Sequence, residues 1–321
     1  MTEEPAAHGT GGSAVSHSPE TIRIGTRGSA LAVAQSQLIG ERLAAATGRP
    51  FVLVHISTRG DRDRAPLAQI GGTGVFVTAV RDALLRGEVD VAVHSYKDLP
   101  TAPDPRIRLG AVPEREDPAD VLCAGNDRTL ARLPSGARVG TGSPRRAAQV
   151  LRLRPDVQVV AIRGNVDTRL AAVDRGEVDA VVLARAGLAR LGRLAAVTQS
   201  FAAVDLLPAP AQGALAVECR ADDARMAATL GAIDDPPTRA ATAAERALLA
   251  GLQAGCSAPV GALATVVERS LVLTARVISA DGGQLREHRS RGPVDCAEEL
   301  GASAANALLA DGAGDLMTGS P

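Results

Sequence analysis

One local pattern occurs in both halves of this chain: a short apolar strand that passes through a glycine-containing turn into a helix. In the first half the strand covers 22–24 and the turn 25–29, and Ser29 starts an alanine-rich helix over 30–46. In the second half a strand at 138–140 leads into a turn that ends with Pro144, a residue that suits a first helical turn.

Further strands that are mainly apolar lie at 51–56, 89–93 and 157–162. They alternate with helical segments, which predicts parallel α/β sheets with helices on both faces. The sequence Arg-Gly-Glu-Val-Asp occurs at 86–90 and again at 175–179, each time before an apolar strand. Two such matches could arise by chance, but in equivalent places they indicate two similar lobes.

The segment after Pro236 differs, with a helix over 238–252, a β-rich stretch over 259–280 and a last helix from Cys296. Asp281-Gly282-Gly283 is typical of a hairpin turn, so we expect a small α+β domain with an antiparallel sheet. A strand over 214–220 would return the chain to the first lobe, and two crossings between lobes would create a cleft. The expected domains are lobe 1 over 21–115 and 214–234, lobe 2 over 116–213, the C-terminal domain over 235–310, and disordered tails over 1–20 and 311–321.

Composition excludes several classes of function. A net charge of −1 argues against a general nucleic-acid binder, and 1% aromatic residues cannot form a stacking surface for single strands. No apolar run is long enough to span a bilayer, and residues 1–20 lack the features of a secretory signal. The cysteines form no Cys-x-x-Cys pair and the histidines show no ligand spacing, so we expect free thiols, a cytoplasmic location and no metal site.

Arginines gather where the predicted strands end. Arg145 and Arg146 follow Ser143 at a helix start, and Arg163 and Arg169 flank the turn after the next strand. Doubly wound folds bind ligands at this edge, and guanidinium groups suit carboxylates or phosphates. Single arginines could instead form surface ion pairs, but the set predicts an anion-binding cleft.

A second candidate site is the segment 93–100, which also follows a strand end. It contains the only tyrosine and the only lysine of the chain, Tyr96 and Lys97, directly before Asp98. A carboxylate among arginines stays ionised and could stabilise a cation or move protons. A helix cap or an ion pair is the alternative role for Asp98. We expect His94 to be a hydrogen-bonded structural residue rather than a base.

The third candidate is Cys256, on a turn between Gly255 and Pro259. An accessible thiol there could be a nucleophile or a covalent anchor, although a packed structural cysteine is the alternative. Cys219 is expected inside a strand, Cys123 in the core, and Cys296 at a helix start with partial exposure. The glycine-rich segment 71–74 lacks the ending of a phosphate loop, and we interpret it as a mobile loop over the cleft.

Seven stretches of the chain occur in the same order as in one known enzyme family: 26–29, 58–61, 93–100, 140–146, 163–169, 212–214 and 255–256. Together they resemble porphobilinogen deaminases, also called hydroxymethylbilane synthases, across residues 21–310. The resemblance implies a transferase of haem biosynthesis that joins four porphobilinogen molecules head to tail, releases ammonia and yields 1-hydroxymethylbilane. It also implies a dipyrromethane cofactor on a thioether to Cys256, and two periplasmic-binding-protein-like, doubly wound α/β lobes plus a small C-terminal α+β domain.

The resemblance further implies roles for single residues. Asp98 matches the catalytic aspartate, which would hold pyrrole N–H groups and stabilise the cation left when ammonia departs. The implied cofactor contacts are Ser95, Lys97, Thr141, Ser143, Arg145, Arg146, Asn165, Arg169 and Cys256. The implied substrate contacts are Arg27, Ser29, Arg163 and Arg190.

This sequence departs from the family pattern at four positions. Gln69 and Thr73 stand in the glycine loop where many relatives have lysine, Tyr96 stands where Met or Leu is usual, and Ala211 where Gly is usual. None of these removes Asp98 or Cys256, so activity is expected. The alternative function is a two-lobed anion-binding module, such as a solute-binding or regulatory effector domain, which has no need of Cys256. We expect a monomer that acts on a small molecule and binds neither nucleic acid nor membrane.

Overall fold

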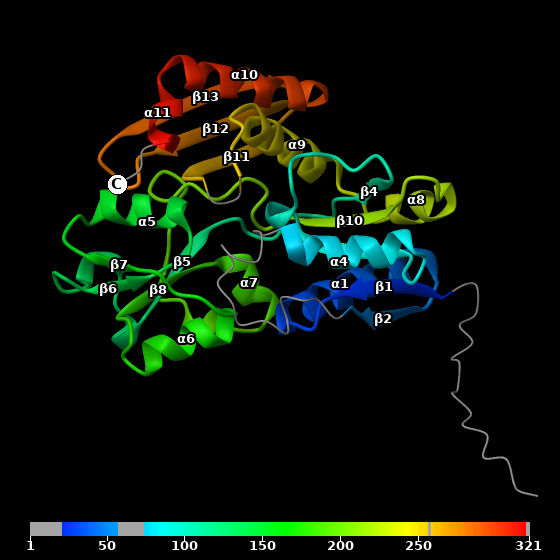
Figure 1. The fold of residues 1–321 in the computed structure, drawn as a ribbon, viewed down its shortest axis with the longest axis horizontal. Coiled ribbons are helices and arrows are strands. Elements are labelled where there is room, and N and C mark those ends of the chain that lie inside the picture. Colours follow the sequence, from blue (N-terminus) through cyan, green and yellow to red (C-terminus); the bar gives the residue numbers. More distant parts are fainter. Residues whose placement is uncertain (1–20, 57–73, 256–257, 319–321) are drawn as a thin grey trace, which may run out of the picture.

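The computed structural model describes residues 21–56, 74–255 and 258–318, which form two α/β lobes and a C-terminal α+β domain (Figure 1). The first lobe has the strand order β2-β1-β3-β10-β4. Its strands are β1 (Ile22–Thr26), β2 (Phe51–His55), β3 (Val91–Ser95), β4 (Ile107–Ala111) and β10 (Leu215–Arg220). Its helices are α1 (Ala30–Thr47), α4 (Gly74–Leu85) and α8 (Ala224–Gly231).

The second lobe repeats this topology with the strand order β7-β6-β8-β5-β9. Its strands are β5 (Asp120–Ala124), β6 (Arg138–Gly140), β7 (Gln158–Val160), β8 (Ala180–Ala184) and β9 (Gln199–Ser200). Its helices are α5 (Pro144–Leu153), α6 (Val166–Asp174) and α7 (Arg185–Arg190). The predicted helix start at Ser29 is confirmed, because its hydroxyl accepts the Ala32 N–H at 3.3 Å. Pro144 is the first residue of α5, as expected.

The prediction of wholly parallel sheets is wrong for one strand in each sheet. Among the described strands, β10 runs antiparallel to β3 and β4, and β5 runs antiparallel to β8 and β9. Both strands receive the chain from the other lobe rather than from a helix of their own lobe. They therefore escape the βαβ connection that makes sequential strands parallel.

The pentapeptide repeat occupies equivalent places in the two lobes, as predicted. Asp90 accepts the backbone N–H of Arg23 in β1 at 3.0 Å and returns its own N–H to the Arg23 carbonyl at 2.8 Å. Asp179 makes the same pair of contacts with Arg138 in β6, at 2.7 and 2.8 Å. Each aspartate thereby ties the turn before one strand to the neighbouring strand of its sheet.

The C-terminal domain packs two helices, α9 (Pro236–Gly251) and α10 (Ala297–Ala310), on an antiparallel sheet, as expected. The sheet has the order β11-β12-β13, with β11 at Val260–Val267, β12 at Ser270–Ile278 and β13 at Leu285–Pro293. The expected hairpin turn at 281–283 joins β12 and β13. The prediction of a disordered tail after Ala310 is wrong for residues 311–318. Ala313–Thr318 form helix α11, and its residues Ala313 and Leu316 are buried in the core of the C-terminal domain.

The two connections between the lobes lie side by side against α9. Arg115, in the first connection, donates from Nε to the Gln212 carbonyl of the second connection at 2.7 Å. Glu245 of α9 is fully buried; it binds the Arg115 guanidinium at 2.7 Å and accepts the Ala211 N–H. Ala211, which stands where Gly is usual in the family, has φ +61°, a left-handed conformation that favours glycine. The C-terminal domain therefore fixes both connections through one carboxylate.

Within the described ranges, no helix is both long and apolar enough to cross a lipid bilayer.

Candidate active site

A pocket of about 210 Å³ opens at the carboxyl ends of β1 and β3. Four of the predicted site residues line it together: Arg27, Ser29, Ser95 and Asp98. Apolar side chains also line the pocket, including Val77 and Val80 of α4. The structure thus brings together, in one concave site, polar residues from two turns that lie far apart in the sequence.

A buried glutamine that sequence reasoning missed supports the polar side of this pocket. Gln35 of α1 is 4% exposed and donates from Nε2 to Ser95 Oγ at 2.8 Å. Its position six residues after the cap residue Ser29, on the buried face of α1, was the available signal. Gln35 fixes the Ser95 hydroxyl, so Ser95 presents a defined donor or acceptor to the pocket.

His94 also lines the pocket and is buried, as expected for a structural residue, but its Nε2 does not make the expected hydrogen bond with any described residue. Its Nε2 lies 3.5 Å from Glu218 Oε2, which is longer than a strong hydrogen bond. Glu218 also forms a bidentate pair with Arg81 of α4, at 2.6 and 2.9 Å. Burial raises the pKa of Glu218, but the neighbouring His94 and the hydrogen bonds and charge of Arg81 outweigh it and hold the pKa at about 2. The carboxylate therefore stays ionised and ties α4 to β10 behind the pocket.

Asp98 ends a single tight turn over Tyr96–Asp98, directly after β3. Its side chain is exposed and makes no hydrogen bond or ion pair with any described residue. Neither the helix cap nor the ion pair considered as its alternative role is present among these residues. An exposed carboxylate that lines the pocket and has no partner among the described residues is available to a bound molecule.

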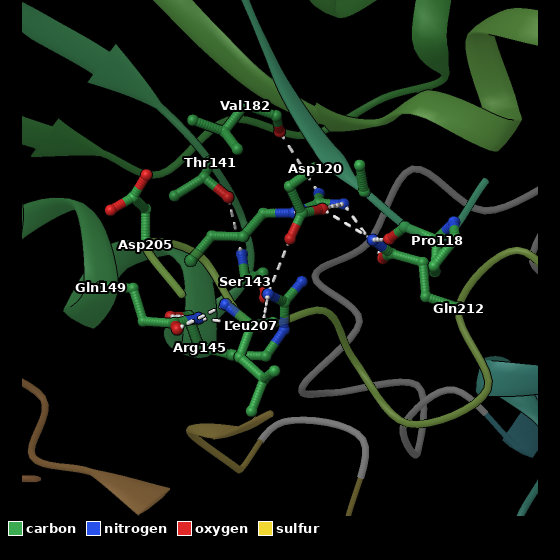
Figure 2. Close-up of polar contacts among 12 residues, drawn as sticks. Pro118, Asp120, Thr141, Ser143, Arg145, Gln149, Val182, Asp205, Leu207 and Gln212 are labelled. Atoms are coloured by element: carbon green, nitrogen blue, oxygen red, sulfur yellow. Dashed lines mark hydrogen bonds and ion pairs between the residues drawn. The ribbon is translucent and has the colours of Figure 1, made fainter. Parts of the chain in front are cut away.

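Arg145 and Arg146 lie in the first turn of α5 and share one buried carboxylate, Asp120 (Figure 2). Arg145 Nη1 lies 2.7 Å from Asp120 Oδ2, and Arg146 Nη2 lies 2.7 Å from Asp120 Oδ1. Arg145 also donates to the Leu207 carbonyl at 2.6 Å, and Arg146 to the Val182 carbonyl at 3.2 Å. Burial raises the pKa of Asp120, but the two arginines outweigh it and hold the pKa far below its usual range.

The sequence alone did not identify Asp120 as a site residue. It is a single acidic residue at the start of an apolar strand, and its two arginine partners lie 25 and 26 residues away in the sequence. Burial lowers the pKa of Arg145. Arg145 Nε is buried and makes no hydrogen bond with a described residue. The pair is thus a preformed cationic cluster with donor capacity left over, rather than a set of surface ion pairs.

Gln212 connects this cluster to the first lobe. Its Nε2 donates to Asp120 Oδ1 at 2.9 Å and to the Pro118 carbonyl at 2.7 Å (Figure 2). Its Oε1 accepts from Lys97 Nζ at 3.2 Å. Burial and the charge of Arg146 lower the pKa of Lys97 to about 8. Arg145 and Arg146 therefore contact Asp120 directly, and Lys97 is linked to it through Gln212, which leaves the cluster positively charged.

The loop before α5 places two more predicted residues beside the cluster. Thr141 is buried, and its Oγ1 accepts the Ser143 N–H at 3.2 Å. Ser143 is the cap residue of α5, but its side chain makes no capping hydrogen bond. The Ser143 hydroxyl therefore remains able to bind a ligand.

Around α6 the predicted residues have different surroundings. Asn165 caps α6, with Oδ1 accepting the Thr168 N–H at 2.8 Å, so only its amide NH₂ can reach a ligand. Arg169 donates from Nε to the Gly164 carbonyl at 3.0 Å, and burial followed by the charge of Arg146 lowers its pKa. Arg163 is exposed.

Arg190, the last residue of α7, reaches the second connection between the lobes. Its Nη2 donates to the Gly213 carbonyl at 2.6 Å, and burial lowers its pKa to about 10. Its Nε is buried and has no hydrogen-bond partner among the described residues. Like Arg145, it holds an unused donor.

Cys256 lies outside the described residues, as do Gln69, Thr73 and the motif at 58–61. The described cysteines match expectation, with Cys123 and Cys219 buried in strands and Cys296 exposed before α10. In the described part of the chain, no group of three or more His, Cys, Asp or Glu side chains could hold a metal ion.

Two family models match the chain. The model described as "Porphobilinogen deaminase, dipyromethane cofactor binding domain" covers residues 22–228, and "Porphobilinogen deaminase, C-terminal domain" covers 240–310. Porphobilinogen deaminase 1 of Streptomyces coelicolor is 53% identical over 311 residues, which is 93% of this chain and 98% of the relative. Porphobilinogen deaminase of Mycobacterium tuberculosis is 53% identical over 307 residues, which is 93% and 99% of the two chains.

Similar solved structures are more distant. The methionine-binding protein MetQ has a TM-score of 0.42 at 12% identity, covering 67% of this chain and 89% of its own. A periplasmic substrate-binding protein of an ABC transporter from Coxiella burnetii has a TM-score of 0.41 at 14% identity, covering 70% and 96%.

Proposed function

This chain belongs to the porphobilinogen deaminase family, and from that premise we propose how its own residues carry out the reaction. It is a transferase of tetrapyrrole biosynthesis with a dipyrromethane cofactor. It joins four porphobilinogen molecules head to tail with loss of ammonia and yields 1-hydroxymethylbilane. The alternative of a non-catalytic anion-binding module finds no support in relatives that are named deaminases over almost their full length.

The described residues fit a dipyrromethane, whose pyrrole rings carry acetate and propionate groups. Carboxylates need cationic donors, and the cluster of Lys97, Arg145 and Arg146 carries more positive charge than Asp120 balances. The buried Nε atoms of Arg145 and Arg190 make no hydrogen bond with described residues, so they can donate to such carboxylates. If acidic side chains of the protein paired with every donor of these arginines, no N–H group would remain to bind a cofactor carboxylate.

We assign the cofactor to Cys256 by a thioether, with polar contacts from both lobes. The holding residues would be Ser95, Lys97, Thr141, Ser143, Arg145, Arg146, Asn165 and Arg169. When bound, the dipyrromethane supplies the pyrrole carbon to which the first substrate is joined. The task of the listed side chains is to hold carboxylates in fixed places, and guanidinium groups keep their charge at any physiological pH.

The observation that carries the proposal is that Asp98 shares one pocket with Arg27, Ser29 and Ser95. Arg27 would bind a substrate carboxylate, and Ser29 and Ser95 would orient the pyrrole ring. The Asp98 carboxylate would accept the pyrrole N–H, and its charge would stabilise the cation that porphobilinogen becomes when ammonia leaves. It would also take up the proton released when two rings are joined.

Arg163 and Arg190, both in the second lobe, would extend the proposed binding path for carboxylates beyond this pocket. Each added ring brings two more carboxylates, so binding of the product chain requires positive charge along its path. The exposed Arg163 and the partly buried Arg190 would supply that charge during later additions.

The test is an Asp98→Asn variant, which keeps the side-chain size but removes the charge. Porphobilinogen consumption and ammonia release should fall by about a hundredfold or more, with the cofactor still attached. Asp156→Asn is the matched control, because Asp156 is an exposed acid paired with Arg154 in the second lobe. Full turnover by Asp98→Asn would remove Asp98 from the proposed role.

We also propose that the enzyme acts as a monomer in the cytoplasm. The three described cysteines are free thiols, which suits a reducing compartment. Light scattering on the purified protein should give the mass of one chain, and a dimer mass would overturn the monomer assignment.

A further inference from the structure

The position of the Asp98 carboxylate depends on its main chain. The side chain is exposed and makes no hydrogen bond or ion pair with a described residue. Whatever fixes the backbone around Asp98 therefore decides where its carboxylate lies. The turn itself contributes one hydrogen bond, from the Leu99 N–H to the Tyr96 carbonyl at 3.3 Å.

One arginine from a different domain fixes this backbone. Arg246 of α9 donates from Nη1 to the carbonyls of Tyr96, at 3.3 Å, and Leu99, at 3.0 Å. Its Nη2 donates to the Pro100 carbonyl at 2.6 Å. The three acceptors flank Asp98 on both sides, so one guanidinium holds the chain before and after the proposed catalytic residue.

The same guanidinium stacks on the ring of Tyr96, with Cζ 4.5 Å from the ring centroid. This contact adds a cation–π attraction to the three hydrogen bonds. Tyr96 is the only tyrosine of the chain and 8% exposed, so the ring is packed against the guanidinium rather than against solvent. Only a planar side chain with a fork of donors can stack and serve three carbonyls at once, which a lysine cannot do.

The placement of Arg246 explains why a residue outside the pocket could affect the chemistry. Arg246 belongs to the domain that carries Cys256, and it lies ten positions before that cysteine in the sequence. Helix α9 thus carries the residue that binds the backbone around Asp98, and it ends five residues before the proposed cofactor cysteine. A shift of about 1 Å in a reacting group can cost about a hundredfold in rate.

We propose that Arg246 is a positioning residue that sets the location of the Asp98 carboxylate through the backbone of residues 96–100. The proposal rests on the catalytic role proposed above for Asp98. It adds to the family's site a residue that need not touch cofactor or substrate.

The test compares kcat and KM for Arg246→Met, Arg246→Lys and a control, Arg239→Met, each loaded with cofactor. Arg239 lies on the same helix and makes comparable contacts, to Asp234 at 2.8 Å and the Gly110 carbonyl at 3.2 Å, but none to residues 96–100. Arg246→Met should lower kcat at least about tenfold with little change in KM. Arg246→Lys should recover part of that loss, and Arg239→Met should keep kcat. Equal kcat in Arg246→Met and wild type would overturn the proposal.

A double-mutant comparison separates positioning from general stability. In an Asp98→Asn background, Arg246→Met should not lower the residual single-turnover rate further, because the group that it positions is gone. A further loss as large as in the wild-type background would show that Arg246 acts elsewhere, and would overturn the proposal. Full activity of Asp98→Asn alone would instead defeat the proposed function itself.

Tyr96→Leu supplies a second measurement if Arg246→Met does not fold. It removes the stacking surface but leaves every hydrogen bond from Arg246 to the backbone. We expect a loss in kcat of about twofold to fivefold, smaller than for Arg246→Met. An unchanged kcat in both Tyr96→Leu and Arg246→Lys would overturn the proposal.

Discussion

Lys97 donates a hydrogen bond to Gln212 at 3.2 Å, and this contact joins the turn of the proposed catalytic aspartate to the connection between the lobes. The amide nitrogen of the same glutamine donates to Asp120, at 2.9 Å. One side chain therefore links a cation of the first lobe to the carboxylate that holds two arginines of the second. The proposed cofactor site is assembled across both lobes rather than within either.

The lowered pKa of Lys97 predicts an alkaline limit on activity, acting through the proposed cofactor contact. Burial and Arg146 lower its pKa from 10.5 to about 8, so the ammonium loses its charge as pH rises through that value. We expect kcat for porphobilinogen consumption to fall above pH 8, because one residue proposed to hold a cofactor carboxylate becomes neutral. Lys97→Arg should move this limit to higher pH, since a guanidinium does not titrate there. An identical alkaline limb in Lys97→Arg would assign the limit to another group.

The same shift predicts the direction of the stability change. Between pH 8 and 10.5 the folded protein binds fewer protons at Lys97 than the unfolded chain does. The contribution of Lys97 to the free energy of unfolding therefore rises with pH across this window. Urea unfolding of wild type and Lys97→Met at pH 7.5 and pH 9.5 measures this contribution. A contribution that falls with rising pH would contradict the assignment.

Asp120 should be a large determinant of stability. Asp120→Asn would leave two buried guanidinium groups without their shared carboxylate, at a cost of about 3–5 kcal/mol in unfolding free energy. Because Arg145 and Arg146 depress its pKa in spite of burial, this stabilisation is present above pH 4 and declines as pH falls further. Denaturant unfolding of Asp120→Asn checks both statements. The control is Asp156→Asn, which removes the charge from the exposed Asp156–Arg154 pair. A cost below about 1 kcal/mol, typical of surface pairs, would mean that Asp120 is not an essential partner.

Ala211 offers a stabilising substitution. Its φ of +61° costs a residue with a Cβ about 1–2 kcal/mol, and glycine avoids this cost at some loss of entropy. Ala211→Gly should therefore raise the free energy of unfolding by about 1 kcal/mol. Ala209→Gly, two positions earlier and without a positive φ, should lower it. Destabilisation by both variants would show that the left-handed turn carries no strain.

Local sequence signals located most of the fold because they depend on neighbouring residues. The apolar runs, the cap at Ser29, and the matching roles of Asp90 and Asp179 follow from patterns a few residues long. The direction of β5 and β10 could not be read this way, because it depends on where the chain arrives from the other lobe. Helix α11 escaped notice because only a few apolar residues, such as Ala313 and Leu316, hold it to the core.

The candidate site was predictable in place but not in its internal pairing. The ends of β1 and β3 bring Arg27, Ser29, Ser95 and Asp98 to one pocket, as the parallel order of these strands requires. That Arg145 and Arg146 share Asp120, and that Arg246 holds the turn of Asp98, depends on contacts across 25 to 150 residues. Such contacts leave no periodic signal in a single sequence.

Intact-mass measurement of the purified chain tests the central claim most directly. Wild-type protein should be heavier than its sequence by one dipyrromethane, and it should gain further pyrrole units on brief exposure to porphobilinogen. Cys256→Ser should have the mass of its sequence alone and consume no porphobilinogen. A wild-type chain that carries no added mass and still makes 1-hydroxymethylbilane would contradict the account.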